Sequence, residues 1–301
     1  MDRLEAMTIL LAAVDRGSLS AASRHLRVPL ATVSRRVAEL EEHLNVRLLH
    51  RGNRKVVLTD SGRNYVTSCR RIIEEIAETE RAASGEYRTP QGELTISLPA
   101  VLGRTHILPI IVEFQRTFPD IRMRMQLTDR FVSLLEEHVD VAVRVGELPD
   151  SSMIATRVGL IRQVVCASPA YLDRRGAPKT PADLAKHDCI VHESSSGSSS
   201  WGFVTDKTMQ TIHVPSRLAV SLGEAAVAAA VAGAGIARVL SYLIEDLLKS
   251  RSLVTLLEAC EPTPFPVSIV YPSQRQVPLK LRAFLDFAVP RLRKQLGYEN
   301  S

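Results

Sequence analysis

The sequence has few cysteines and no long apolar run. Its four cysteines lie far apart with no Cys-x-x-Cys pair, which excludes a zinc ribbon and a disulfide framework: Cys69, Cys166, Cys189 and Cys260. Cys166 and Cys189 stand in apolar, strand-like runs, which favours burial over a redox role. No apolar stretch reaches the roughly 18 residues of a membrane span, and the N-terminus lacks the small-residue cleavage site of a secretory signal. We therefore expect a cytoplasmic protein that does not enter a membrane.

Motifs for catalysis and for metal binding are missing as well. No serine lies in a G-x-S-x-G turn with acid and base partners. The histidines at 106, 138, 187 and 192 have no ligand spacing. GAGIA at 233–237 lacks the lysine of a phosphate-binding loop, so it predicts a helix-to-strand turn. The sequence therefore predicts no enzyme activity, no metal site and no bound cofactor.

The positive charge is concentrated toward the N-terminus. A chain of 301 residues is long enough for two domains, each with its own core. The formal net charge is +5, but residues 16–63 alone hold ten Arg or Lys and four Asp or Glu, a net of +6. Residues 91–301 hold 23 and 21, a net of +2. A polyanionic partner is therefore expected at the N-terminal region.

The first 59 residues predict three helices and a two-stranded wing. Apolar residues fit a helix from Leu4 to Val14, and Ser18 is the N-cap of a short second helix. After a turn over residues 27–29, a third helix runs to about His43, with an apolar stripe made of Leu30, Val33, Val37, Leu40 and Leu44. Helices joined by so short a turn are typical of a helix-turn-helix. VRLLH and KVVLT, on either side of RGNR, predict the strands of the wing.

The polar face of the third helix indicates a DNA contact. Hydroxyl and guanidinium groups fill its first two turns, whereas Glu39, Glu41 and Glu42 come later. An arginine fork can bind O6 and N7 of one guanine together, and basic wing residues can reach the DNA backbone or the minor groove. The candidate DNA-binding residues are Ser18, Thr32, Ser34, Arg35, Arg36, Arg51, Arg54 and Lys55. A solvated basic helix beside a solvated hairpin is the alternative that this pattern leaves open.

A long helix follows the predicted wing. Thr59 and Asp60 cap its start, and spacings of four and three residues define a heptad-like seam made of Tyr65, Cys69, Ile72, Ile76, Thr79 and Ala83. A helix from Asp60 to Tyr87 would be roughly 40 Å long, too long to pack wholly on a small domain. A second copy of the chain is therefore its expected partner, and the linker RTPQG ends the helix.

From residue 91 the pattern changes to strands alternating with helices. Strands are predicted at ELTISL, IRMRMQL, DVAVRVG, QVVCAS, RLAVSL and FPVSIVYP. Helices are predicted at ILPIIVEFQRTF, SLLEEHV, GEAAVAAAVAGA, SYLIEDLLKS and LKLRAFLDFAVPRLRKQL. This alternation is typical of the α/β fold class.

Residues 1–87 resemble the DNA-binding region of the LysR-type transcriptional regulators. The resemblance rests on AASRHLRVPLATVSRRVAELEEHLNVRLLHR and KVVLTDSGRNYV, in which helix-turn-helix, wing, Thr-x-Ser-Gly-like cap and linker helix follow the family's order. Members often open the recognition helix with Ser-Gln-Pro-Ala, whereas this sequence has Pro-Leu-Ala-Thr at 29–32. The expected DNA contacts on that helix therefore start at Thr32 rather than at residues 30 and 31.

The resemblance also implies the organisation of the whole chain. Residues 1–59 would form a mainly α winged helix-turn-helix, and residues 60–90 a linker and dimerisation helix with its hinge. Residues 91–301 would form an α/β effector-binding domain of the periplasmic-binding-protein type, with two lobes hinged around a cleft. Lobe I would comprise about 91–161 and 268–301, and lobe II about 162–267.

The effector site is expected beyond the carboxyl ends of the strands, where helix N-termini offer free N–H groups. By similarity to the family, the residues that line it are Ser97, Pro99, Ala100, Thr128, Arg144, Gly146, Ser194, Ser195, Ser196, Ser221 and Gly223. Their hydroxyls and amides, with Arg144 as counter-charge, would suit a small carboxylate. For each single hydroxyl, an ordinary helix cap is the alternative.

These features predict a transcription factor that binds double-stranded DNA as a homodimer and responds to a small-molecule effector. The family resemblance adds a homotetramer, and RNA polymerase is a further expected partner. The rival interpretation is a small-molecule-binding protein or enzyme with α/β lobes, in which the N-terminal helices serve only for oligomerisation. Such a protein would not need the net +6 of residues 16–63.

Overall fold

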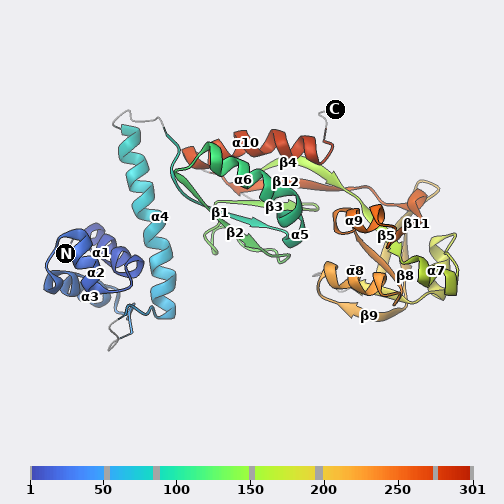
Figure 1. Ribbon diagram of the computed structural model, residues 1–301, viewed down its shortest axis with the longest axis horizontal. Helices are drawn as coiled ribbons and strands as arrows, with labels where there is room; N and C mark the ends of the chain where they lie inside the picture. Colours follow the sequence, from blue (N-terminus) through green and yellow to red (C-terminus); the bar gives the residue numbers. More distant parts are fainter. Residues whose placement is uncertain are drawn as a thin grey trace. The chain divides into compact units, whose positions relative to one another are not determined.

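The chain forms two compact units, Met1–Gly92 and Glu93–Ser301 (Figure 1). The computed structural model describes residues 2–50, 55–83, 89–148, 153–193, 199–273 and 277–298. Five predicted site residues lie outside these ranges: Arg51, Arg54, Ser194, Ser195 and Ser196. None of the described helices combines the length and apolar character needed to cross a membrane.

The N-terminal unit begins with the three predicted helices, α1 (Arg3–Asp15), α2 (Leu19–Leu26) and α3 (Leu30–Leu44). The Ser18 hydroxyl accepts a hydrogen bond from the Ala21 amide at 3.1 Å, which confirms its role as the N-cap of α2. The turn between α2 and α3 is tight because Arg27 takes a left-handed conformation, with φ of 55°. Buried side chains of α1 and α3 form the core, among them Ile9, Leu10, Val33, Val37 and Leu40.

Leu30 was predicted on the buried stripe of α3, and this prediction is wrong. Its side chain is 45% exposed. Leu30 is the first residue of the helix, one turn beyond the point where α3 meets the core through Val33. An apolar side chain is therefore presented to solvent at the tip of the predicted recognition helix.

The predicted wing is reduced to a single β-bridge between Leu49 and Leu58, and the described parts of residues 46–59 contain no longer strand. Glu41 of α3 holds one side of this bridge, because its Oε1 accepts hydrogen bonds from the amides of Leu48 at 2.7 Å and Leu49 at 3.0 Å. The bridge itself is closed by backbone hydrogen bonds from the His50 amide to the Val57 carbonyl at 2.9 Å and from the Thr59 amide to the Leu48 carbonyl at 3.0 Å. The carboxylate and the bridge together fix the segment.

The predicted long helix is present as α4 (Asp60–Ala83), and residues 84–87 of the prediction lie outside the described residues. The first part of its seam packs within this chain. Val66 and the partly buried Tyr65 pack into the core of α1 to α3, and Cys69 is fully buried. Ile72 is 36% exposed. Only the later part of the seam is therefore left for a second copy.

Lobe I is a five-stranded sheet in the order β2-β1-β3-β12-β4. The strands are β1 (Gly92–Leu98), β2 (Ile121–Leu127), β3 (Val141–Val145), β4 (Met153–Ile161) and β12 (Phe265–Pro272). One face packs on α6 (Leu108–Thr117) and α10 (Leu279–Gln295) through residues such as Phe114 and Phe284. A short α5 (Ala100–Leu102) and a π-helical turn, Gly103–Ile107, lead into α6.

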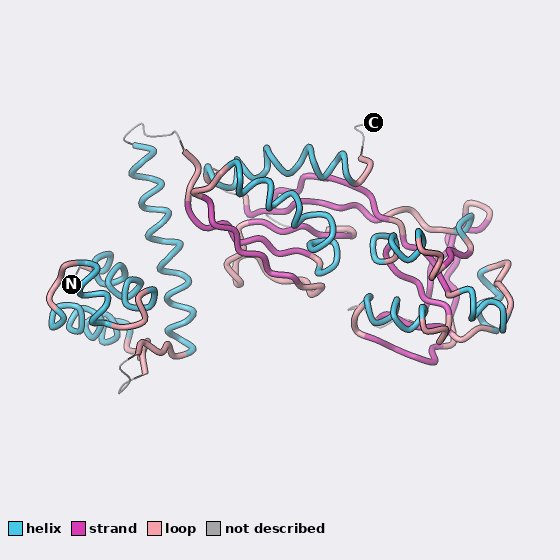
Figure 2. The backbone as a smooth tube through the Cα atoms, viewed as in Figure 1, coloured by secondary structure: helices cyan, strands magenta, loops and turns pink. Residues whose placement is uncertain are grey.

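The other face of this sheet is covered by residues 128–140, drawn as loop in Figure 2. SLLEEHV was predicted as a helix within this segment, and that prediction is wrong. The chain makes only hydrogen-bonded turns here, because His138 takes a left-handed φ of 53° and Val139 bonds back to the Leu134 carbonyl at 2.8 Å. Leu134 and Val139 are then buried against Ala142 of the sheet.

Lobe II is a second five-stranded sheet in the order β11-β5-β10-β6-β9, with a separate β7-β8 ribbon. Its strands are β5 (Gln163–Ala167), β6 (Cys189–His192), β9 (Ser216–Val220), β10 (Ile236–Leu240) and β11 (Val254–Leu256), and the ribbon joins β7 (Ser200–Thr205) to β8 (Thr208–His213). One face packs on α7 (Pro169–Arg175) and the 3-10 turn Pro181–Lys186. The opposite face packs on α8 (Gly223–Val231) and on the segment that leads into α9 (Glu245–Lys249).

The sequence patterns missed β4, β6, β7, β8, β10 and β11. SYLIEDLLKS, predicted as one helix, is a 3-10 turn at Ser241–Leu243 followed by the short α9. GAGIA is the predicted helix-to-strand turn, with Gly233 at φ 76°. The α/β fold class itself is confirmed.

Two segments connect the lobes, and an ion pair ties them together. β4 runs into β5 through Arg162, and the chain returns to β12 after the 3-10 turn Glu258–Cys260. Arg162 Nη1 lies 3.2 Å from a carboxylate oxygen of Glu261 on the returning segment. β12 begins at Phe265, three residues before the predicted start of the second part of lobe I.

Candidate DNA-binding and effector-binding sites

The N-terminal end of α3 presents donors to solvent. Its N-cap is Pro29, which has no side chain to bond the first amides. Amides left free at a helix N-terminus, together with the helix dipole, attract phosphate groups. Ser34 is exposed and Thr32 is half-buried on the same two turns. Leu30, the first residue of α3, is exposed beside them.

Arg35 and Arg36 stand side by side in the sequence but have different surroundings. Arg36 Nη2 lies 3.0 Å from Glu5 and its Nη1 3.1 Å from Glu39, so its guanidinium joins α1 to α3. The Arg35 side chain is 64% exposed, and its nearest carboxylate, Glu39, is 3.8 Å away. The Arg35 guanidinium is therefore exposed and only loosely paired, whereas Arg36 is held within the domain.

Glu41 holds the wing region against α3, and the close approach of Gly62 and Thr59 holds it against α4. Neither Glu41 nor Gly62 was among the predicted site residues. Burial alone would raise the pKa of the Glu41 carboxyl, but hydrogen bonds from the Leu49 and Leu48 amides and from Arg47 lower it below its ordinary value. At α4, the Gly62 amide donates to the Thr59 hydroxyl at 2.9 Å, and this hydroxyl donates to the Arg47 carbonyl at 2.7 Å. The Thr-x-Ser-Gly-like cap was the sequence signal for Gly62, whereas Glu41 stood only among the acidic residues late in α3.

Lys55, a predicted DNA-binding residue of the wing region, is exposed. Ser18, also predicted to contact DNA, uses its hydroxyl oxygen to cap α2.

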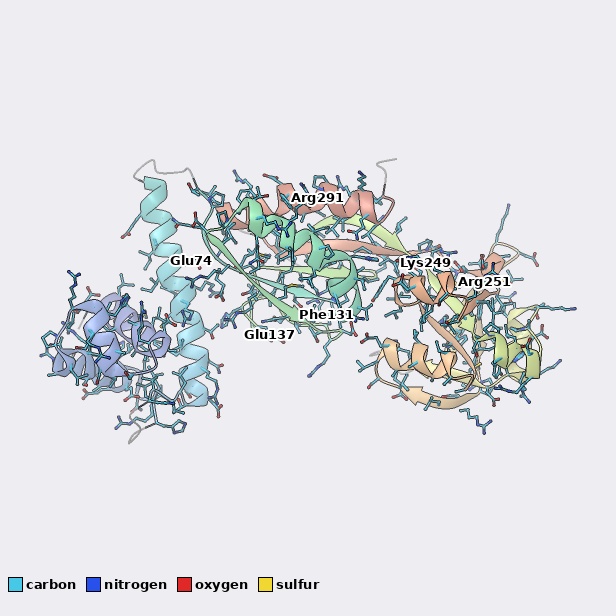
Figure 3. The ribbon with its side chains drawn as sticks, viewed as in Figure 1. Glu74, Phe131, Glu137, Lys249, Arg251 and Arg291 are labelled. Atoms are coloured by element: carbon cyan, nitrogen blue, oxygen red, sulfur yellow. The ribbon has the colours of Figure 1, made fainter. Side chains whose placement is uncertain are left out.

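In lobe I, the structure brings Ser97 and Arg144 together. Arg144 is only 7% exposed, and its Nη1 donates to the Ser97 hydroxyl at 3.4 Å. Its Nη2 donates to the Val132 carbonyl at 3.2 Å, and its guanidinium lies 5.2 Å from the ring centre of Phe131. Phe131 is labelled in Figure 3. The buried Nε has no hydrogen-bond partner among the described residues. Burial lowers the pKa of Arg144 from its ordinary high value. The Nε–H is a donor that no described residue uses.

The neighbouring strand ends are closed by internal hydrogen bonds. The Ala100 amide, which follows Pro99 at the start of α5, donates to the carboxylate of Asp129 at 3.0 Å. The Thr128 hydroxyl accepts from the Arg130 amide at 3.2 Å, and the Gly146 amide donates to the Pro266 carbonyl at 2.9 Å. Asp129 therefore already places a carboxylate on the helix end where an effector carboxylate was expected.

The lobe II candidates lie at the start of α8. Ser221 is exposed, and Gly223 is buried, where a Cβ would meet the Leu243 side chain at 2.9 Å. Two side-chain contacts connect the lobes beside them. Arg104 lies 3.3 Å from Glu224, and His106 Nε2 lies 3.6 Å from Glu245. The faces of the two lobes that carry the candidate residues are thus in contact.

His106 makes this contact sensitive to pH. Burial lowers its pKa below the ordinary value of 6.5, and the weaker influence of Glu245 raises it. The unfolded chain therefore takes up a proton more readily than the folded chain when the pH falls below 6.5, so stability is lost as the pH falls through that window and is unaffected well above it. We expect His106→Gln to make this decrease smaller, measured by urea unfolding at pH 7.5 and 5.5 with the fluorescence of Trp201, which is 3% exposed.

The matched control is His213→Gln, at an exposed position of β8. This variant should lose the same amount of stability between pH 7.5 and pH 5.5 as the wild type. If His106→Gln also loses the wild-type amount, His106 is not the source of the pH dependence.

The buried cysteines have the properties of inert core residues. Burial raises the pKa of the Cys166 and Cys189 thiols to about 12, with a further contribution from Asp188 at Cys189. A thiol with so high a pKa forms little of the reactive thiolate at neutral pH. Within the described ranges, no group of three or more His, Cys, Asp or Glu side chains is arranged to hold a metal ion.

Two family models match the chain, one in its N-terminal unit and one over most of the remainder. Residues 4–63 match the family model described as "Bacterial regulatory helix-turn-helix protein, lysR family", and residues 88–293 match "LysR substrate binding domain". This chain belongs to the LysR family of transcriptional regulators. It is a DNA-binding regulator with a helix-turn-helix and an effector-binding domain.

Related LysR-type regulators align with this one over nearly their whole length. The HTH-type transcriptional regulator CrgA of Neisseria meningitidis serogroup C (strain 8013) is 33% identical over 296 residues, which is 97% of this chain and 98% of CrgA. The HTH-type transcriptional activator AaeR of Escherichia coli (strain K12) is 30% identical over 288 residues, 95% of this chain and 93% of AaeR. These comparisons give no support to the rival interpretation as an enzyme or simple binding protein.

Solved structures of LysR-type regulators share the fold. The structure of CrgA from Neisseria meningitidis has a TM-score of 0.62 at 31% identity and covers 96% of this chain and 98% of that one. The full-length structure of the Vibrio cholerae virulence activator AphB has a TM-score of 0.60 at 27% identity and covers 95% and 98%.

Proposed function

We propose that this regulator binds an operator as a homodimer, with α3 of each copy in the major groove. The observation that carries the proposal is the contrast between the exposed Arg35 and the internally paired Arg36. Arg35 reads a base edge, and Ser34, Thr32 and the free amides of α3 contact phosphate. Lys55, and Arg51 and Arg54 outside the described residues, contact the DNA backbone. Such a function places the protein in the cytoplasm with its DNA.

Arg35→Ala should weaken operator binding by about 1–3 kcal/mol and relax the sequence preference, because one base-reading fork is lost. The measurement is fluorescence anisotropy across a salt series, with duplex from the region upstream of its own gene. Arg71→Ala, which removes an exposed arginine of α4, is the control and should change affinity little.

Arg36→Ala distinguishes the role of Arg36 from that of Arg35. It should lower the stability of the N-terminal unit, because it removes the ion pairs to Glu5 and Glu39, and it should leave the sequence preference intact. If Arg36→Ala relaxes the preference and Arg35→Ala does not, the assignment is reversed. If the wild type binds neither this duplex nor a selected random pool, the proposed operator binding fails.

The proposed dimer forms through the later part of α4, where Ile72 is exposed and Ile76 is half-buried. Further assembly through the effector-binding domains would give a homotetramer, and RNA polymerase is the expected partner at the promoter. The relatives' full-length structures support assembly in general.

The proposed effector is a small carboxylate bound between the lobes. Its support is the cation of Arg144, which has an unused Nε donor next to Ser97, and the presence of Asp129 on the Ala100 amide. An effector carboxylate would replace Asp129 there and meet the hydroxyls of Thr128 and Ser221. The effector would act by binding one arrangement of the lobes more tightly than the others. A ligand with equal affinity for every arrangement would not shift the equilibrium between them. DNA bend angle with and without the effector tests this step.

A further inference from the structure

A basic hollow lies on lobe II, away from both sites described above. Its volume is about 440 Å³, and it is formed by the end of α7, the following loop and the 3-10 turn Pro181–Lys186. Its polar lining residues are Arg174, Arg175, Lys179, Asp183, Lys186 and His187. Tyr171 and Leu184 anchor these elements on one face of the lobe II sheet, whereas α8, which carries the effector-site candidates, packs on the opposite face (Figure 1).

The positive charge of the hollow is not balanced from within. Four cationic side chains line it and only one carboxylate, Asp183. Asp183 is already occupied, since its Oδ2 accepts from the Thr180 amide at 2.9 Å, the Thr180 hydroxyl at 3.0 Å and the Lys179 amide at 3.1 Å. Neither Lys179 nor Lys186 has an ion-pair partner within 4 Å among the described residues. A concave surface of this kind concentrates anions.

The two arginines are held in place by backbone groups. Arg174 Nη2 donates to the Gly233 carbonyl at 2.9 Å, and Arg175 Nη2 donates to the Lys186 carbonyl at 3.1 Å. Arg175 also lies 4.0 Å from Asp188, which Arg217 approaches more closely at 3.3 Å. Each guanidinium has five N–H groups, so most donors remain available while the side chains are already ordered. Ordered donors lower the entropy cost of binding.

His187 is the remaining polar residue of this lining. Its Nδ1 lies 3.2 Å from the Tyr171 hydroxyl, which accepts a hydrogen bond from the Asp188 amide at 2.9 Å. Burial, with a smaller contribution from Arg175, lowers the pKa of His187 below its ordinary value.

We propose that this hollow binds a small, multiply charged phosphate compound, which makes it a second ligand site of the regulator, independent of the effector cleft. Guanidinium forks bind phosphate oxygens in pairs, and the two lysines supply unpaired point charges. A hollow of this volume holds a small molecule.

The test is the binding of inorganic pyrophosphate to the full-length chain. Isothermal titration calorimetry measures the affinity and the number of sites at two salt concentrations. Wild type should bind one pyrophosphate per chain. The double variant Lys179→Gln with Lys186→Gln should weaken binding about tenfold or more, because it removes two charge-assisted contacts. The matched control is Lys207→Gln with Lys249→Gln, which removes the same charge from exposed positions of lobe II outside the hollow (Figure 3). It should change the affinity less than about twofold.

Three results would overturn the proposal. One is the absence of saturable pyrophosphate binding by wild type, and another is an equal loss in both double variants, which would mean that only net charge matters. The third is equal binding of citrate, which would show that the hollow does not select phosphate. Operator affinity in the same variants separates this site from DNA binding: we expect it to be unchanged, and a loss of operator affinity without a loss of pyrophosphate affinity would assign these lysines to DNA.

Discussion

Glu41→Ala should lower the free energy of unfolding of the N-terminal unit by about 3 kcal/mol. The carboxylate is 8% exposed and accepts hydrogen bonds from the Leu48 and Leu49 amides and from Arg47. Alanine leaves the two amides without an acceptor, and an unsatisfied buried donor costs about 1–3 kcal/mol. Hydrogen exchange of the amides in residues 2–50 of the full-length chain measures the effect, because these amides report opening of this unit.

Glu42→Ala is the matched control, since Glu42 is exposed and adjacent. It should change stability by less than about 0.5 kcal/mol. The pH dependence gives a second check. Because the folded pKa of Glu41 is lowered, its stabilisation is present above 4.5 and is lost as the pH falls through the folded value. Equal exchange rates in the two variants would show that Glu41 does not hold this segment.

Gly62→Ala should destabilise the same unit by about 2 kcal/mol. A Cβ at this position would collide with the backbone carbonyl of Leu48, which cannot move freely because it accepts from the Thr59 amide at 3.0 Å. The collision costs about 3 kcal/mol, and the better helix propensity of alanine offsets about 1 kcal/mol. We expect faster exchange at Leu48 and Leu49 together with weaker operator binding at higher temperature.

Ser61→Ala, at the exposed neighbouring position of α4, controls for a change in helix propensity. It should behave like wild type. Should Gly62→Ala prove as stable as Ser61→Ala, the close approach of α4 to residue 48 would not be a constraint on the fold.

The predicted features that the structure confirms are those carried by local periodicity. α1 to α4, α6, α8 and α10 follow from apolar spacing and caps, and each of these signals is contained in the helix itself. The failures have two causes. SLLEEHV is interrupted locally by the left-handed conformation of His138, whereas the lobe II strands β6 and β10 are short runs whose pairing partners lie far along the chain.

The candidate sites show the same limit. Ser97 and Arg144 were predicted from the strand-end rule, and the structure places them in contact. Nothing in the local sequence shows that Asp129 reaches the Ala100 amide or that Arg36 is paired with Glu5, since each pair joins separate elements. The basic hollow of lobe II likewise combines residues from α7 and the 3-10 turn, and neither segment is strongly basic alone.

The burial of Val66 and Cys69 has a mechanical consequence for α4. Because the first turns of this helix belong to the core that also holds α3, the recognition helix and the dimerisation helix move as one solid piece. From Asp60 to Ile76 the helix is about 24 Å long. If two copies meet near Ile72 and Ile76 as proposed, a rotation of a few degrees there would displace each recognition helix by ångströms, without any flexible joint between the contact and the groove.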